Sequence, residues 1–256
     1  MKVEEVLQKY EYKPDMLLDQ HFLADEKIVG KLLSLIDINE TDVIFEVGAG
    51  IGTFTEQIPK CKKIFAVDID KKVIQILKKE VKRKEMEIIE GNALELLSKL
   101  KFTKIMSSTP YSICEPLFHK LFIIDFEKAL VIVPEKFSSI ITEGKSPLGF
   151  FSNLFLEINS IVLIPREKFL PKPKVDSVAL LITKKKPSIS QQIYLQKDKK
   201  IKNLLRELLC KNKKLTKKQA KDAINKQFDG SAILEKKPGK LKIEELEELE
   251  KFITSC

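Results

Sequence analysis

Three of the nine glycines in this 256-residue chain fall within five positions, in the segment Glu46-Val47-Gly48-Ala49-Gly50-Ile51-Gly52. The run directly before it, Val43-Ile44-Phe45, has the apolar composition of a buried strand. Glycines after a strand let the backbone turn sharply and approach a ligand, because no Cβ stands in the way. The segment therefore predicts an α/β fold whose first strand ends in a loop that binds a nucleoside cofactor.

Two classes of cofactor compete for this glycine loop. In the dinucleotide fingerprint Gly-x-Gly-x-x-Gly, a loop between a strand and a helix carries a pyrophosphate. Here Gly52 comes one position too early for that pattern. The acidic Glu46 would repel a pyrophosphate but could accept a hydrogen bond from an amino group. S-adenosylmethionine has such an amino group and no phosphate, although the loop alone leaves both cofactors open.

Polar residues also follow the next two predicted strands. The run Lys63–Val67 ends at Asp68, a position from which a carboxylate can accept hydrogen bonds from ribose hydroxyls. The run Glu87–Glu90 is followed by Gly91 and by Asn92, whose side chain could reach the edge of an adenine. Three successive strand ends thus offer polar groups to one nucleoside. This ordered series favours S-adenosylmethionine and methyl transfer.

Composition limits the remaining possibilities. Apolar residues make up 43% of the chain and charged residues 32%, which suits a globular protein with one α/β domain and a smaller appendage. No apolar run approaches the length of a membrane span, and the N-terminus lacks the core of a signal peptide, so we expect a cytoplasmic protein. The four cysteines are far apart, which indicates reduced thiols and no metal site. No long heptad pattern indicates a dimer, so we expect a monomer.

Apolar runs and helical patterns alternate along the first 185 residues. Strands are expected at 42–47, 63–68, 86–90, 103–107, 127–134, 156–164 and 177–183. Helical patterns lie between them, as at 71–84, and a first helix is expected at 24–36. This alternation predicts a Rossmann-like methyltransferase domain at 1–185, with a mostly parallel sheet covered by helices on both faces. Helical patterns at 199–210, 217–228 and 243–253 predict a small helical domain at 186–256.

The net charge of +9 is concentrated in one part of the chain. Residues 184–242, here called the basic segment, hold 19 Lys or Arg and 5 Asp or Glu, whereas residues 1–183 hold 26 and 27. A neutral catalytic part joined to a basic segment suits a protein that acts on a polyanion such as RNA. A solvated, lysine-rich surface is the alternative. Proteins from hot environments are also rich in Lys and Glu, but this does not explain the segregation.

The fourth predicted strand runs into Ser108-Thr109-Pro110-Tyr111, which resembles the acceptor motif of methyltransferases that modify exocyclic amines of bases. Such an amine is a poor nucleophile, because its lone pair is delocalised into the ring. The enzyme must therefore accept hydrogen bonds from the N–H groups. The Ser108 hydroxyl and the Thr109 carbonyl are candidates, and Tyr111 could stack on the base. Alone, the segment would fit a simple turn, but the preceding strand ends favour an acceptor site.

Four segments resemble the ribosomal RNA adenine dimethyltransferase family, whose members dimethylate adenines near the 3′ end of small-subunit RNA. Asp19-Gln20-His21-Phe22-Leu23 is similar to the family's Gly-Gln-Asn-Phe-Leu, and the glycine loop follows at the expected distance. Residues 108–111 are similar to Asn-Leu-Pro-Tyr. Residues 165–177 follow Pro-x-x-x-Phe-x-Pro-x-Pro-Lys-Val-x-Ser, which is the most specific match. The resemblance covers about residues 15–225 and implies a divergent, archaeal member.

The resemblance and the polar strand ends together imply a set of site residues. The S-adenosylmethionine site would be lined by His21, Leu23, Glu46, Gly48, Gly50, Asp68, Asn92 and Ser108. The acceptor site would comprise Ser108, Thr109, Pro110 and Tyr111, with Phe169 facing Tyr111 across a flipped base. Phe169 also fits a plain hydrophobic anchor between two prolines. Lysines would contact RNA phosphates, the last three of them at the start of a basic helix: Lys172, Lys174, Lys211, Lys213 and Lys214.

The chain departs from the family pattern at four of these positions. The family's Asn, Asp, Asn and Leu are replaced by His21, Asn92, Ser108 and Thr109. Ser108 matters most, since a hydroxyl reaches less far than an amide carbonyl. The segment lies nearer to the Ser-Pro-Pro-Tyr of DNA methyltransferases that act on cytosine N4. The target could therefore be adenine N6 or cytosine N4.

Three hypotheses follow for the function of the chain. The first is a methyltransferase that acts on a base amine of small-subunit ribosomal RNA. The second is a catalytically weak relative that serves as an RNA-binding ribosome-assembly factor, motivated by the replacements at 108 and 109. The third is a small-molecule methyltransferase, which is disfavoured because the basic segment would then have no partner.

Overall fold

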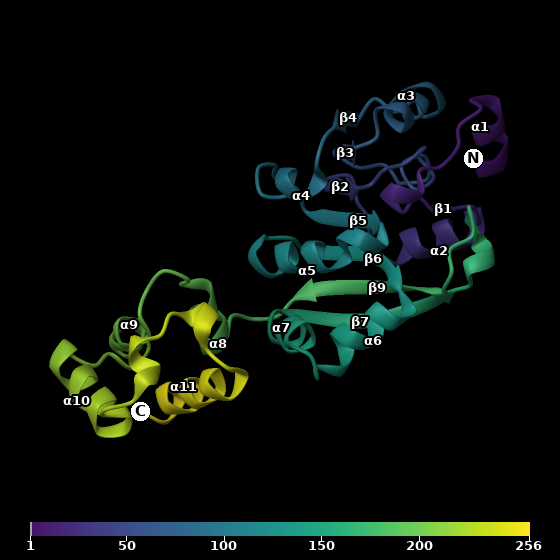
Figure 1. The fold of residues 1–256 in the computed structure, drawn as a ribbon. Helices are drawn as coiled ribbons and strands as arrows, with labels where there is room; N and C mark the ends of the chain where they lie inside the picture. The colour runs from purple at the N-terminus through teal and green to yellow at the C-terminus, as the bar shows by residue number, and fades with distance from the viewer. Residues whose placement is uncertain (1) are drawn as a thin grey trace. The chain divides into compact units, whose positions relative to one another are not determined.

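The computed structural model describes residues 2–256, which form two compact units. The first extends to Lys184, and the second runs from Lys185 to Cys256 (Figure 1). The first unit is built on a seven-stranded sheet. In sheet order its strands are β4 (Met86–Glu90), β3 (Lys63–Asp68), β2 (Val43–Val47), β5 (Lys104–Ser108), β6 (Lys128–Pro134), β9 (Ser177–Lys184) and β7 (Leu156–Ile164). All seven strands expected from the sequence are present, with ends that differ by at most one residue.

The sheet is mostly parallel, as predicted. Strands β4, β3, β2, β5 and β6 run parallel to one another, and β9 pairs antiparallel with both β6 and β7. Consecutive residues of β2 are buried from Ile44 to Val47, so both faces of the sheet are covered. Leu32 and Leu33 of helix α2 (Glu26–Leu35) pack in the same apolar cluster as Ile44. The fold is therefore the predicted Rossmann-like α/β fold.

The helices and 3-10 turns of the first unit lie between these strands. They are α1 (Val3–Lys9), η1 (Met16–Leu18), α2 (Glu26–Leu35), α3 (Lys71–Glu80), α4 (Ala93–Leu96), η2 (Tyr111–Ile113), α5 (Cys114–Ile123), α6 (Glu135–Glu143), α7 (Pro147–Phe155) and η3 (Arg166–Lys168). The Asp25 and Asp70 side chains cap α2 and α3 by accepting hydrogen bonds from backbone N–H groups of the first turn.

The helix expected at 71–84 ends four residues early, at Glu80. Val81 is extended and only 3% exposed, because it packs into the core rather than continuing the helix. The Arg83 guanidinium donates to the carbonyl of Thr55 at 2.9 Å and pairs with Glu85. The sequence has helical periodicity as far as residue 84, but these contacts end the helix earlier.

A two-stranded sheet joins two segments that lie far apart in the sequence. Strand β1 (Phe22–Leu23) pairs antiparallel with β8 (Phe169–Leu170), with Phe22 opposite Leu170 and Leu23 opposite Phe169. Both strands belong to segments that resemble family motifs. The pairing attaches the N-terminal segment to the residues that precede β9.

The second unit is helical, as the sequence predicted. It comprises α8 (Ile189–Leu195), α9 (Ile201–Lys213), α10 (Lys217–Phe228), η4 (Ala232–Glu235), η5 (Pro238–Lys240) and α11 (Ile243–Ser255). The three helices expected in residues 186–256 are confirmed as α9, α10 and α11, and α8 is an additional helix. Within the second unit, the rings of Phe228 and Phe252 make an edge-on contact, with their centroids 5.0 Å apart. A capping box formed by Thr216 and Gln219 begins α10.

Candidate cofactor and acceptor site

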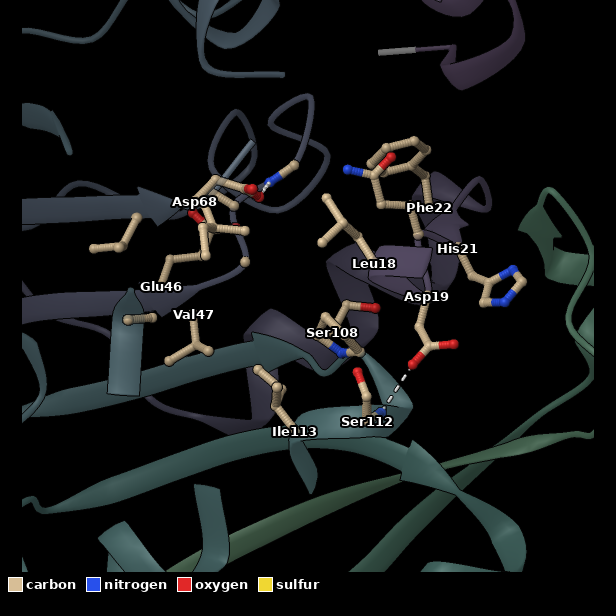
Figure 2. A pocket seen from close by; sticks show the side chains of 18 of the residues that line it. Leu18, Asp19, His21, Phe22, Glu46, Val47, Asp68, Ser108, Ser112 and Ile113 are labelled. Atoms are coloured by element: carbon tan, nitrogen blue, oxygen red, sulfur yellow. Dashed lines mark hydrogen bonds between the residues drawn. The ribbon is translucent and has the colours of Figure 1, made fainter. Parts of the chain in front are cut away.

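The order of the strands places a crevice at one edge of the sheet. The chain proceeds from β2 through β3 to β4 on one side, and it then returns to place β5 on the other side of β2. In open α/β sheets, ligands bind outside the carboxyl ends of the strands at such a switch point. A pocket lies there, lined by residues that follow β2, β3, β4 and β5 and by residues 17–23 (Figure 2).

The eight side chains or glycines that were predicted to hold the cofactor all line this pocket. They are His21, Leu23, Glu46, Gly48, Gly50, Asp68, Asn92 and Ser108. Of the predicted acceptor residues, Ser108 and Pro110 line it. Thr109, Tyr111 and Phe169 are not among the residues that line the pocket.

The glycine loop needs glycine for its conformation. Gly48, Gly50 and Gly52 have φ angles of +70°, +57° and +98°, a region that other L-residues rarely adopt. At Gly50 there is also no space for a side chain, because a Cβ would lie 3.0 Å from a ring carbon of Phe22. The turn thus presents bare backbone to the pocket.

Asp68 holds the glycine loop to the next strand. Its Oδ2 accepts the N–H of Gly50 at 2.8 Å, and its Oδ1 accepts the N–H of Asp70 at 2.9 Å. Burial raises the pKa of this carboxyl, against the effect of the two hydrogen bonds. Each oxygen retains a further lone pair, so the group could still accept from two hydroxyls of a ribose.

Glu46 is buried at the end of β2, with 3% of its surface exposed. Its Oε2 accepts a hydrogen bond from the Thr55 hydroxyl at 2.6 Å. Burial raises its pKa to about 8, so the side chain is mostly protonated at neutral pH. A cationic ligand beside it would favour the ionised form.

The charges around the pocket distinguish between the two cofactor classes. Three acidic residues line it, namely Asp19, Glu46 and Asp68, and among its lining residues, all in the described part of the chain, there is no Lys or Arg. A pyrophosphate would meet like charge here without a cationic partner. A ligand with a sulfonium and an ammonium group would meet opposite charge. The residues present therefore fit S-adenosylmethionine better than a dinucleotide.

Asn92 is exposed at the end of β4, where it caps α4. Its Oδ1 accepts the N–H of Leu94 at 3.0 Å. The oxygen that was expected to meet the adenine amine therefore already makes one hydrogen bond, and one lone pair remains for a ligand. The hydrogen bond from Leu94 also fixes the direction of the Asn92 side chain.

A chain of two hydrogen bonds and one separate hydrogen bond hold the acceptor motif in place. The buried Thr109 hydroxyl donates to Ser107 Oγ at 2.8 Å, and Ser107 donates to the Val47 carbonyl at 3.1 Å. The Tyr111 hydroxyl lies 3.0 Å from Ser177 Oγ, and burial raises its pKa. Tyr111 therefore connects the acceptor motif to the last residue of the segment 165–177.

The structure places Phe169 in the core of the first unit, and the base sandwich with Tyr111 stays a prediction. Phe169 is 5% exposed, lies opposite Leu23 in the β1–β8 pair, and packs in the same apolar cluster as Leu33 and Ile164. This placement fits the hydrophobic anchor that the sequence also allowed. The ring that does lie beside Tyr111 is His21, with centroids 5.9 Å apart.

This placement of Phe169 gives a testable expectation. Phe169→Leu should lower the free energy of unfolding by about 1 to 2 kcal/mol, since it removes buried ring atoms from a packed cluster. The turnover number for RNA should change by less than about twofold if no base stacks on the ring. Urea denaturation and single-turnover assays measure the two effects. A large loss of turnover with unchanged stability would support the base-stacking role.

The predicted RNA-binding lysines lie in both units. Lys172 pairs with Glu167 at 2.5 Å, and Lys174 is exposed. The structure corrects the other expectation: Lys211 and Lys213 lie in the last turn of α9, and Lys214 follows it in the left-handed conformation, so none begins a helix. Lysines at a helix C-terminus also interact favourably with its dipole. Their contact with RNA stays a prediction.

Two pocket residues that belong to no predicted site are Asp19 and Ser112. The Asp19 carboxylate accepts the N–H of Ser112 at 3.0 Å, across 93 residues of sequence. The sequence did contain a signal, because Asp19 replaces the glycine of the family pattern Gly-Gln-Asn-Phe-Leu. Its φ of +50° shows why a glycine suits that position.

The fold and the pocket together define the class of S-adenosylmethionine-dependent methyltransferases. The model of the ribosomal RNA adenine dimethylase family matches residues 15–251. The chain belongs to this family. Among the residues that the structure describes, no helix is long and apolar enough to cross a membrane, and no group of three or more His, Cys, Asp or Glu could hold a metal ion.

Archaeal relatives match the chain over nearly its whole length. It is 31% identical to the probable ribosomal RNA small subunit methyltransferase A of Pyrococcus furiosus, over 96% of this chain and 94% of the relative. It is 30% identical to the protein of the same name from Thermococcus sibiricus, over 98% and 96%.

Solved structures support the same fold. A dimethyladenosine transferase from Plasmodium falciparum superposes with a TM-score of 0.63 at 23% identity, over 90% of this chain and 96% of that one. A 23S rRNA methyltransferase gives a TM-score of 0.60 at 15% identity, over 91% and 99%.

Proposed function

We propose that this protein transfers methyl groups from S-adenosylmethionine to an exocyclic base amine of small-subunit ribosomal RNA. The observation that carries the proposal is the position of Ser108, at the end of β5 in the wall of the acidic pocket. The names of the archaeal relatives support the substrate class. Membership of the adenine dimethylase family favours adenine N6 as the target. The sequence Ser-Thr-Pro-Tyr keeps cytosine N4 as a second candidate.

Different residues of the site would bind the cofactor and the base. Asp68 would hold the ribose of the cofactor, Asn92 its adenine and Glu46 its amino group. The bound cofactor would supply a methyl group on a positively charged sulfur. The Ser108 hydroxyl and the Thr109 carbonyl would accept the N–H groups of the base, so that the nitrogen lone pair becomes available for attack. Tyr111 would stack on the base.

RNA binding would rest on the basic segment. This part of the chain carries 19 Lys or Arg and 5 Asp or Glu, so it could neutralise several phosphates without base contacts. Lys172 and Lys174, which follow β8, would add phosphate contacts near the acceptor motif. A small-molecule substrate would leave these charges without a partner.

A labelling experiment tests the proposed activity and its target base. The protein is incubated with S-adenosylmethionine that carries a labelled methyl group and with unmethylated small ribosomal subunits, and the RNA is digested to nucleosides. We expect label in N6-methylated adenosines, whereas label in N4-methylcytidine would establish the second target. Ser108→Ala should lower the rate by about 100-fold, as the loss of one transition-state hydrogen bond does in other enzymes.

The exposed Ser139 on α6 offers a matched control. Ser139→Ala makes the same chemical change outside the pocket and should leave the rate unchanged. No label above the Ser108→Ala background would contradict the proposed activity and would favour an RNA-binding assembly factor.

A further inference from the structure

Asp19 occupies a backbone conformation that costs free energy. It ends η1 with φ +50° and ψ +40°, in the left-handed region that a non-glycine residue seldom adopts. Such positions persist where the surrounding structure fixes them, and they cluster at functional sites. Here the carboxylate is fixed by the N–H of Ser112 in η2, which binds Oδ2 at 3.0 Å.

The fixed carboxylate belongs to the acceptor side of the pocket. Figure 2 shows the Asp19 side chain extending from η1 toward Ser112, on the side of the pocket where Ser108 also lies. Its anchor, η2, is the turn that carries Tyr111. Burial raises the pKa of the Tyr111 hydroxyl, and the charge of Asp19 adds to this effect, as expected of a nearby carboxylate.

One oxygen of the carboxylate remains available. Within the described residues, the hydrogen bonds to the Asp19 side chain involve Oδ2 alone. Oδ1 therefore keeps its full capacity as an acceptor. The Ser108 hydroxyl and the Thr109 carbonyl can accept hydrogen bonds from a base amine, but neither is a good base. The carboxylate on this side of the pocket can also take a proton.

We propose that Asp19 is a catalytic residue that accepts an N–H of the target base amine and takes its proton during methyl transfer. This inference rests on the proposed function and deepens it. The nitrogen–methyl bond forms while the sulfur–methyl bond breaks, and the electron pair of the broken bond remains on sulfur. The nitrogen becomes positively charged, and it returns to neutrality when its proton passes to Oδ1 of Asp19. A preorganised negative charge is most effective where positive charge develops in the transition state.

The alternative partner for this carboxylate is the amino group of the cofactor itself. The two roles differ in what a mutation changes. An acceptor of the base amine acts on turnover, whereas a ligand of the cofactor acts on cofactor affinity. Both quantities can be measured on the same variant.

Asp19→Asn is the decisive variant. Asparagine tolerates the left-handed conformation and keeps a carbonyl oxygen for the Ser112 N–H, but it loses the charge and the ability to take a proton. We expect the turnover number with small ribosomal subunits to fall by about 100-fold. The affinity for S-adenosylhomocysteine, measured by titration calorimetry, should stay within about twofold. Asp15→Asn is the matched control, since Asp15 caps the other end of η1 and lies outside the pocket lining.

Asp19→Gly and Ser108→Asn keep the test informative if the asparagine variant is poorly folded. Glycine suits φ +50° and removes the carboxylate, so turnover should again fall by about 100-fold. Adding Ser108→Asn supplies an amide acceptor from β5 and should recover at least about tenfold of that loss.

The outcomes separate the inference from the proposed function. Unchanged turnover in both Asp19 variants would overturn the inference while the wild-type activity stands. A tenfold weaker affinity for S-adenosylhomocysteine with turnover retained would make Asp19 a cofactor ligand and would also overturn it. A wild-type protein without activity would remove the proposed function, and the inference with it.

Discussion

Asp68→Ala is expected to weaken the binding of S-adenosylmethionine by at least about 100-fold. The carboxylate would accept two ribose hydroxyls, and a hydrogen bond to a charged group contributes about 1.5 to 3 kcal/mol. Losing two of them amounts to about 3 to 6 kcal/mol, which is roughly 10²- to 10⁴-fold in the dissociation constant. The variant also frees the N–H groups of Gly50 and Asp70, so the glycine loop loses its fixed geometry.

The neighbouring strand supplies the control for this variant. Glu90 lies opposite Asp68 in the β3–β4 register, but it is exposed and stands outside the pocket lining. Glu90→Ala should bind the cofactor as the wild type does. Titration calorimetry with S-adenosylhomocysteine measures all three proteins. An Asp68→Ala dissociation constant within about threefold of the wild-type value would show that the cofactor ribose lies elsewhere.

The strands of the fold could be predicted from the sequence because each is a short apolar run bounded by turn or charged residues. The same signal does not give strand direction. Strand β9 pairs antiparallel with β6 and β7, yet its run Ser177-Val178-Ala179-Leu180 has the composition of any buried strand. Direction is set by the path of the preceding chain, which periodicity does not describe.

Long-range contacts explain why the surroundings of Phe169 could not be predicted from the sequence. Phe169 lies between a charged turn and a proline in sequence, and nothing local indicates which way its ring points. Pairing with β1 places it opposite Leu23 and turns it into the core. The polar strand ends were easier to predict, because parallel strands bring their carboxyl ends to one edge whatever their neighbours are.

The role of Asp19 could not be inferred from its neighbours in the chain. The hydrogen bond that orients it comes from Ser112, which is 93 residues away. In the sequence, Asp19 only stands where the resembling family segment has glycine. The left-handed φ shows that the residue adopts a glycine-like conformation and places a carboxylate in the pocket.

Glu46 is expected to make the stability of the protein fall as the pH rises from about 5 to about 8. Its pKa is about 8 in the folded protein and near the ordinary value of 4.5 in the unfolded chain. Between these values the folded state binds more protons than the unfolded state, so the free energy of unfolding decreases with increasing pH. The separation corresponds to at most about 5 kcal/mol, fully lost above pH 8.

Glu46→Gln should remove this pH dependence, because glutamine is neutral throughout and retains an oxygen for the Thr55 hydroxyl. The variant should match the wild type near pH 5, where both side chains are uncharged in the fold, and exceed it in stability by several kcal/mol at pH 8.5. Urea denaturation at pH 5, 7 and 8.5 measures the difference, with the exposed Glu90→Gln as the control for removing a carboxyl group. Parallel pH profiles for wild type and Glu46→Gln would show that Glu46 is ionised in the fold. The acidic pocket would then hold its negative charge before any cationic cofactor arrives, rather than acquiring it on binding.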